Sequence, residues 1–347
     1  MNKLFICDHR AILEIKGKES FDLLQGLITN DIFRIKDNQL LYTAMLNSKG
    51  RFFCDFFAFT NREDCDKIII DCPKIMANEL KNKLNFYKLR KNITIEIADN
   101  WLIAIDTNSD RKGLEDINKI NKSKNINYFS FQDPRKESFL NHIYYYSNDN
   151  DKNQILQLRQ ELESIGFINN INDYHSHRIK NRIIEGDIDL TIDKSIIAEF
   201  DFDNLNAICY DKGCYIGQEL TARTHYLGKI RKKIAIFTIA DNNDKLLTKI
   251  LGKYYTAKED FLIKDWQQQR EITTLFKSLE IFKKNSKIEE GFNDKSCGNI
   301  LTISISNNKI IGLAIIDTPD EIINDNMVAS YFDNNQFYCK DFKIELQ

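Results

Sequence analysis

Eight consecutive residues, 212–219, hold most of the chemistry that this sequence displays. They read Lys-Gly-Cys-Tyr-Ile-Gly-Gln-Glu, so one thiol, Cys214, lies between two glycines and two residues after Lys212. A nearby ammonium group favours the thiolate, which is the form that attacks electrophiles and binds soft metal ions. The spacing indicates that Cys214 is a reactive thiol or a metal ligand and that Lys212 assists it electrostatically. The alternative is an inert thiol in a glycine turn before a helix, since most single cysteines are packing residues.

Polar side chains extend this candidate site beyond the thiol. Gln218 and Glu219 close the segment, and Arg223 stands four residues after Glu219. Amide, carboxylate and guanidinium groups offer the hydrogen-bond donors and acceptors that suit a polar planar ligand. Together with the aromatic ring of Tyr215, they form the set of residues that we assign to ligand binding.

Residues 212–219 resemble the K-G-C-Y-x-G-Q-E signature of the YgfZ-type folate-binding proteins, whose mitochondrial counterparts are iron–sulfur cluster assembly factors. The match is uninterrupted, which makes it far more specific than an isolated glycine motif. Arg223 also stands where the family carries an arginine. Residues 24–31, which read LQGLITND, and residues 41–56 follow further phrases of the same group. The resemblance therefore extends over most of the chain.

Residues 41–56 read as a β-hairpin, because two apolar runs flank the turn sequence Asn47-Ser48-Lys49-Gly50. This phrase resembles the glycine-cleavage T-protein (aminomethyltransferase) superfamily, in which a comparable hairpin carries an acidic pair. Alignment on the glycine of the turn places Cys54 at the first acid and Asp55 at the second. The resemblance implies that the first acid serves catalysis, so Cys54 argues against aminomethyl transfer, unless Cys54 is simply a core residue of an apolar strand. Asn47 and Asp55 are assigned to folate binding.

The resemblance implies a tetrahydrofolate-binding protein that supports assembly or repair of [4Fe–4S] enzymes, including tRNA-modifying ones. The implied cofactor is tetrahydrofolate or a one-carbon derivative, and the implied partners are iron–sulfur assembly proteins or [4Fe–4S] client enzymes. Cys214 is the only candidate metal ligand, and Cys214 and Lys212 are the candidate catalytic pair. An accessory factor is favoured over a glycine-cleavage enzyme. Two alternatives stay open: a folate-dependent aminomethyl- or methyltransferase, and an RNA-modification accessory protein, suggested by the basic residues within 229–233.

Composition sets limits on function and compartment. The 347 residues carry a net charge of −2, which gives no global electrostatic reason to bind nucleic acid or a membrane. The eight cysteines include no C-x-x-C pair, so neither a disulfide framework nor a self-contained cluster or zinc site is indicated. No run approaches the roughly 20 apolar residues of a membrane span, and the first residues lack the pattern of a secretory or transit peptide. We therefore expect a cytoplasmic, bacterial protein without membrane or direct nucleic-acid contact.

The elements expected to hold these segments are a mixture of strands and helices, which is typical of an α+β layer structure. Strands are predicted near 3–7, 10–16, 66–71, 93–98, 101–106, 126–131 and 139–146, and helices near 21–27, 73–89, 152–165 and 173–183. Ser20 is expected to cap the first helix. His175 and His177 are two residues apart and do not share a helical face, so we expect surface histidines rather than a metal pair.

The resemblance implies a T-protein-like (aminomethyltransferase-like) folate-binding body followed by a C-terminal antiparallel β-barrel. We place the body at 1–230, with a middle subdomain at about 100–170, and the barrel at 231–347. Strands predicted at 234–239, 300–305 and 309–316 fit the barrel. An amphipathic segment within about 255–290 is expected to be a helical insertion, and the polar residues 107–125 are expected to form a loop with some helix.

Overall fold

The computed structural model describes residues 4–37, 39–61, 64–106, 126–137, 139–147, 152–164, 171–228, 230–239, 265–277, 279–283, 296–306, 309–319, 327, 330, 332–333, 336–339 and 342–347. Internal contacts divide the chain into two compact units. Unit 1 comprises residues 1–169, 192–195 and 202–222, and unit 2 comprises residues 170–191, 196–201 and 223–347. The loop expected at 107–125 and much of the expected insertion lie outside the described residues.

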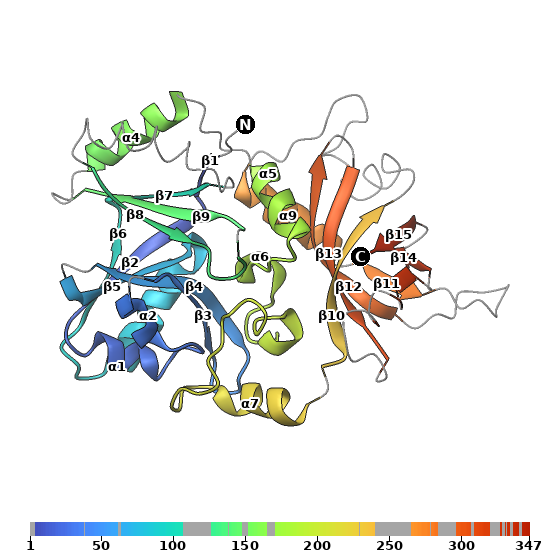
Figure 1. Ribbon diagram of the computed structural model, residues 1–347, viewed down its shortest axis with the longest axis horizontal. Coiled ribbons are helices and arrows are strands. Elements are labelled where there is room, and N and C mark those ends of the chain that lie inside the picture. Colours follow the sequence, from blue (N-terminus) through green and yellow to red (C-terminus); the bar gives the residue numbers. More distant parts are fainter. Residues whose placement is uncertain are drawn as a thin grey trace. The chain divides into compact units, whose positions relative to one another are not determined.

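Two antiparallel sheets form the centre of unit 1 (Figure 1), with the strand orders β3-β4-β5-β2-β6 and β1-β7-β9-β8. The strands are β1 (Leu4–Ile6), β2 (Arg10–Lys16), β3 (Leu41–Leu46), β4 (Phe52–Asn61), β5 (Asp64–Pro73), β6 (Thr94–Ala98), β7 (Trp101–Asp106), β8 (Asn127–Gln132) and β9 (Asn141–Tyr146). All strands expected in this part of the chain are present. The smaller sheet includes β1, so the middle layer is not confined to residues 100–170.

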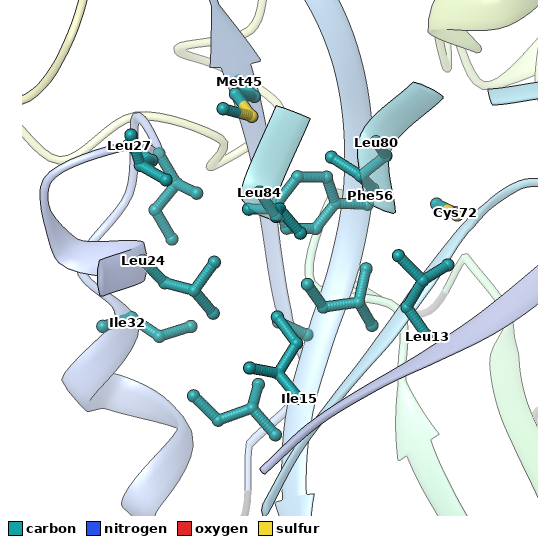
Figure 2. Packing of buried hydrophobic residues seen from close by; sticks show 14 of the residues in the cluster. Leu13, Ile15, Leu24, Leu27, Ile32, Met45, Phe56, Cys72, Leu80 and Leu84 are labelled. Carbon is teal, nitrogen blue, oxygen red and sulfur yellow. The ribbon is translucent and has the colours of Figure 1, made fainter. Parts of the chain in front are cut away.

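Helices α1 (Ser20–Gln25) and α2 (Ala77–Lys88) cover one face of the five-stranded sheet, flanked by the 3₁₀ helices η1 (Ile32–Asp37) and η2 (Lys74–Met76). Figure 2 shows Leu24 and Leu84 of the two helices against Ile15 and Phe56 of the sheet. Fully burying such a side chain stabilises the fold by about 1.5–3 kcal/mol. This apolar layer therefore decides which side chains of β4 point inward.

Two expected helix starts are corrected by the structure. Ser20 is the first residue of α1 rather than its cap, and its hydroxyl donates to the carbonyl oxygen of Gly17 at 2.6 Å. Pro73 ends β5, and α2 begins only after the intervening turn of η2. At Pro73 the pairing of β5 with Arg10 of β2 prevails over the preference of proline for a helix start.

The second face of the five-stranded sheet packs against the four-stranded sheet through aromatic rings. Alternation along β4 directs Phe57 and Phe59 to this face, opposite Phe56. The ring centroid of Phe59 lies 4.6 Å from that of Tyr144, and the ring centroid of Phe57 lies 4.5 Å from that of His142. Helix α4 (Lys152–Ser164) covers the far face of the smaller sheet with Ile155, Leu158 and Leu162. Unit 1 is therefore a helix–sheet–sheet–helix stack.

Unit 2 is built on a closed antiparallel barrel with the strand order β10-β13-β12-β11-β14-β15 (Figure 1). The strands are β10 (Lys232–Ile239), β11 (Glu280–Lys283), β12 (Ser296–Ser306), β13 (Lys309–Asp317), β14 (Phe337–Cys339) and β15 (Phe342–Leu346). Helices α5 (Ile171–Lys180) and α9 (Trp266–Lys277) pack against β12, and unit 2 also contains the short α6 (Gly186–Asp189) and η3 (Ile197–Phe200). The expected C-terminal barrel is confirmed, but β11 falls in the range expected to be an insertion.

A buried ion pair holds α5 and α6 in unit 2. Arg178 and Asp189 are both fully buried, and Nη1 of the arginine lies 2.7 Å from a carboxylate oxygen of the aspartate. Nε of Arg178 donates to Nδ1 of His175 at 2.9 Å, and Nε2 of the same ring lies 2.9 Å from the hydroxyl of Thr302. His175 is 0% exposed, so the expectation of a surface histidine is wrong there.

Candidate functional site

The signature segment lies along residues 26–30 of unit 1. The backbone N–H groups of Cys209 and Ile216 donate to the carbonyl oxygens of Thr29, at 3.0 Å, and Gly26, at 3.1 Å. These bonds join the signature and the residues just before it to the phrase within 24–31, which also follows the family pattern. Two segments far apart in the sequence are therefore neighbours in the fold.

Two glycines bring the signature against the turn between β3 and β4. Gly50 has φ 75° and Gly217 has φ 86°, in a region that L side chains rarely adopt. A Cβ added to Gly217 would lie 2.6 Å from the carbonyl oxygen of Asn47, and a Cβ added to Gly50 would lie 2.8 Å from the carbonyl oxygen of Gly217. Around Gly213, by contrast, an added Cβ meets no atom within 4 Å. The hairpin turn and the second glycine of the signature are thus in direct contact, whereas the residue before Cys214 has open space.

Lys212 ties the start of the signature to the neighbouring backbone. Its Nζ donates to the carbonyl oxygens of Ile28 and Asn30 at 2.7 Å each and lies 5.1 Å from the ring centroid of Tyr215. Burial lowers the pKa of Lys212 to about 8, although the Asp31 carboxylate opposes this shift. The contacts give Lys212 a positioning role. Electrostatic assistance to the thiol stays a prediction.

The two cysteines of this region differ in access. Cys214 is exposed, whereas Cys209 is buried and its sulfur lies 3.4 Å from a guanidinium nitrogen of Arg34. Within the described ranges, no group of three His, Cys, Asp or Glu side chains is placed to hold a metal ion. Cys214 thus presents one accessible thiol on a loop that is fixed on both sides.

The other residues assigned to ligand binding fall into two groups. Gln218, the first residue of α7 (Gln218–Leu227), accepts the backbone N–H of Tyr215 at 3.1 Å through Oε1. Tyr215 is half-buried, and burial raises the pKa of its phenol to about 12. Glu219 and Arg223 are exposed and lie one helical turn apart on α7. Gln218 therefore shapes the loop, whereas ligand binding by Tyr215, Glu219 and Arg223 stays a prediction.

The side chain of Asn47 stabilises the hairpin turn through hydrogen bonds. Its Oδ1 accepts the backbone N–H groups of Lys49, at 2.9 Å, and Arg51, at 3.0 Å. Its Nδ2 donates to a carboxylate oxygen of Asp193 at 2.8 Å. Because both ends of the amide are engaged within unit 1, the geometry supports turn formation by Asn47, and its assignment to folate binding stays a prediction.

Cys54 and Asp55 lie on opposite faces of β4. Cys54 is 1% exposed and belongs to the apolar cluster beneath α1 and α2. Asp55 is 2% exposed, faces the aromatic layer and accepts the phenol O–H of Tyr42 at 2.7 Å. The alternative interpretation of Cys54 as a core residue matches this placement. The structure therefore gives no geometric reason to count Cys54 against aminomethyl transfer.

A buried polar network in the same layer escaped the sequence analysis. The Arg135 guanidinium lies 4.9 Å from the ring centroid of Phe57 and 5.3 Å from that of Tyr42, and it pairs with Asp133 at 2.8 Å. His142 contributes Nε2 at 2.9 Å from the same carboxylate. Burial raises the pKa of Asp133, but Arg135 and His142 outweigh this effect and hold it well below its usual value. Asp133 and Arg135 lie two residues apart in the turn after β8, and the pairing of β8 with β9 brings His142 to them.

Comparisons with known proteins agree with the signature, although no model of a protein family matches the chain. The chain is 27% identical over 245 residues to the "Iron-sulfur cluster assembly factor IBA57 homolog, mitochondrial" of Mycosarcoma maydis, covering 67% of this chain and 56% of that protein. It is 28% identical over 250 residues to the Dictyostelium discoideum homologue, covering 65% and 60%, and 26% identical over 246 residues to IBA57 of Mus musculus, covering 66% and 64%. The matched segment spans 56–64% of these relatives.

A solved structure supports the fold class. The glycine cleavage system aminomethyltransferase T from Bartonella henselae aligns with a TM-score of 0.61 at 9% identity and covers 99% of this chain and 84% of that one. The relatives above are named as mitochondrial, which overturns the expectation of a bacterial cytoplasm. Of the helices within the described residues, none is long and apolar enough to cross a membrane. The resemblance drawn from the signature is confirmed: the chain is similar in sequence to the IBA57 iron–sulfur cluster assembly factors, and its fold is aminomethyltransferase-like.

Proposed function

We propose that this chain supports iron–sulfur cluster assembly and that Cys214 is its working thiol. The observation that carries the proposal is the exposed Cys214 on a loop fixed by Lys212 on one side and by Gly217 on the other. Thiolates are the ligands that iron–sulfur clusters take, and an accessible thiol is the one that can meet them. The names of the IBA57 relatives support the same role.

The cluster is cargo in this proposal. A single thiolate supplies one of the four cysteine ligands that a [4Fe–4S] cluster takes. The remaining ligands come from a partner, which is an assembly protein or a [4Fe–4S] client enzyme, tRNA-modifying clients included. Because the relatives are mitochondrial proteins, the same compartment is proposed for this chain and its partners.

We further propose that unit 1 binds tetrahydrofolate or a one-carbon derivative at the aromatic layer around Asp55. A carboxylate accepts the N–H groups of a pterin ring, and aromatic rings stack on it. Asp55 supplies the carboxylate, and the ring of Tyr42 lies 5.1 Å from Phe57 and 5.9 Å from Phe202, centroid to centroid. These residue types suit a pterin ring, and because all of them are buried, binding requires the layer to open. Bound folate would supply one-carbon chemistry, and this chain's residues would bind and orient it.

Folate binding is tested by calorimetry on folded, full-length protein. We expect a micromolar dissociation constant, about −8 kcal/mol, and at least tenfold weaker binding for Asp55→Asn, which cannot accept as a carboxylate does. Asn78→Ser on α2 is the comparison variant, because Asn78 is exposed and is not among the residues assigned to folate binding. Absence of heat and of competition by a folate analogue would remove the cofactor from the account and leave the fold as it is.

An aminomethyltransferase is the second candidate, favoured by the fold and by an acid, Asp55, in the aromatic layer. A strain that lacks this chain separates the candidates. We expect lower [4Fe–4S] enzyme activities, unchanged glycine cleavage, and loss only of those modified tRNA nucleosides that depend on [4Fe–4S] enzymes. Release of ammonia and methylene-tetrahydrofolate by the purified protein from an aminomethylated carrier would instead establish the second candidate. Loss of modified nucleosides with all [4Fe–4S] enzyme activities intact would favour an RNA-modification accessory.

A further inference from the structure

The C-terminal end of α2 presents apolar and positively charged side chains together. Phe86 is 72% exposed and Leu89 is 82% exposed, and Arg90 next to them is also exposed. We call Phe86, Leu89 and Arg90, with the flanking Lys88 and Lys91, the α2-end patch. Single exposed apolar residues are ordinary on a surface, but an exposed aromatic and an exposed leucine three residues apart at one helix end are a cluster that needs a cause.

The backbone at Leu89 points to a cause outside unit 1. Leu89 follows the last helical residue with φ 49° and ψ −113°. Helices that end in the left-handed region usually carry glycine there, because a Cβ is strained in that conformation. A leucine at this position gains no burial in exchange, since its side chain lies in solvent. Strained residues that packing does not explain are concentrated at sites of function.

The positive charge at the end of α2 indicates a partner with an acidic surface. Residues 81–91 contain five Lys and Arg residues and no Asp or Glu, in a chain whose net charge is −2. Lys81 pairs with Glu96 at 2.6 Å and Lys91 pairs with Glu19 at 3.3 Å. Among the residues that the structure describes, Arg90 forms no ion pair. The surface therefore keeps a positive excess beside its apolar side chains, which an acidic surface would complement.

We propose that the α2-end patch docks a partner protein whose contact surface combines carboxylates with apolar side chains. Aromatic and arginine side chains are the ones that most often dominate the energy of protein interfaces, and Phe86 and Arg90 supply both. A membrane is the poorer fit, because Asn78, Glu79 and Asn82 are polar and exposed on the same helix. The exposed apolar surface is therefore a small patch at one end of α2, whereas a helix that lies on a membrane needs a continuous apolar face. This docking surface is additional to the function proposed for Cys214.

Photo-crosslinking in cells tests the chemistry of the partner. A photoreactive phenylalanine analogue is placed at position 86 of the full-length chain, and the crosslinked peptides are sequenced by mass spectrometry. The control is the same analogue at position 156 on α4, because Leu156 is also exposed, at 56%. At position 86 we expect crosslinks to protein segments in which Asp and Glu outnumber Lys and Arg and flank apolar residues. These segments should not be crosslinked at position 156. Crosslinks to lipid, to nucleic acid or to a second copy of this chain, or a set equal to that of the control, would overturn the proposal.

Binding of the identified protein, purified and without a cluster, then gives the energetics independently of Cys214. Phe86→Ser and Arg90→Glu should each weaken the dissociation constant at least tenfold, whereas Leu156→Ser should change it less than twofold. Leu89→Gly removes the side chain and relieves the backbone, so it should weaken binding while the melting temperature stays the same or rises. Unchanged binding by Phe86→Ser and Arg90→Glu, or loss of binding by Leu89→Gly only together with a lower melting temperature, would contradict the docking role.

Discussion

Substitution of Gly217 by alanine tests whether the signature is held in place by its contact with the hairpin turn. The residue has φ 86°, and a Cβ in the left-handed region costs about 1–2 kcal/mol. The added Cβ would also lie 2.6 Å from the carbonyl oxygen of Asn47 and 3.0 Å from Cα of Gly50. Both contacts are backbone atoms, which cannot turn away as a side chain can, so overpacking adds about 1–3 kcal/mol. Gly217→Ala should therefore destabilise unit 1 by about 2–5 kcal/mol.

The assay is urea unfolding followed by tryptophan fluorescence. The chain has two tryptophans, and Trp266→Phe leaves Trp101 of β7 as the reporter of unit 1. Gly213→Ala in the same background is the matched control, because an added Cβ there meets no atom within 4 Å, and it should lie within about 0.5 kcal/mol of its parent. A Gly217→Ala variant as stable as its parent, or a Gly213→Ala variant destabilised to the same extent, would show that the contact with the hairpin turn does not hold the signature in place.

Three further predictions concern charge and thiol access. Arg178→Met leaves Asp189 buried without its partner, so it should cost unit 2 about 3–5 kcal/mol in urea unfolding, and addition of Asp189→Leu should restore most of the loss; additive losses would contradict the role of the ion pair. Burial lowers the pKa of Lys212 to about 8 from 10.5, so between these values the unfolded chain binds more protons than the folded chain. The contribution of Lys212 to the free energy of unfolding should therefore rise from pH 8 to pH 10.5; comparison of wild type with Lys212→Met over this range checks it, and an equal pH slope of the two proteins would show that the side chain is solvated. Finally, iodoacetamide followed by peptide mass spectrometry should modify exposed Cys214 at least tenfold faster than buried Cys209, and equal rates would mean that the loop is not held as the structure shows.

Most of the fold could be predicted from the sequence, because its strands are apolar runs separated by turn signals. The hairpin at 41–56 is the clearest case, since a short polar turn with glycine between two such runs fixes both strands and their pairing. Helix boundaries were harder to predict: Ser20 is the first residue of α1 and bonds to Gly17, and Pro73 pairs with Arg10 in the sheet before α2 begins. Residue type sets a local preference, and tertiary contacts settle the boundary.

The candidate site could be predicted only in part from the sequence. The signature located Cys214, but side-chain type does not distinguish a group that binds a ligand from one that binds the backbone. Lys212, Asn47 and Gln218 all carry suitable polar groups, and the structure uses each to shape a loop. The buried network of Asp133, Arg135 and His142 was not predicted, because its residues match no known motif and their burial depends on packing between the two sheets.

The central claim is that Cys214 is the working thiol of an iron–sulfur assembly function, and rescue of [4Fe–4S] enzyme activity tests it most directly. A strain lacking this chain is supplied with wild type, Cys214→Ser or Cys209→Ser at matched protein levels. A serine hydroxyl is close in size to the thiol but cannot replace a thiolate as a soft metal ligand. We predict no rescue by Cys214→Ser, with an unchanged melting temperature, and full rescue by Cys209→Ser. Full rescue by Cys214→Ser would contradict the account and reduce the signature to a folding element.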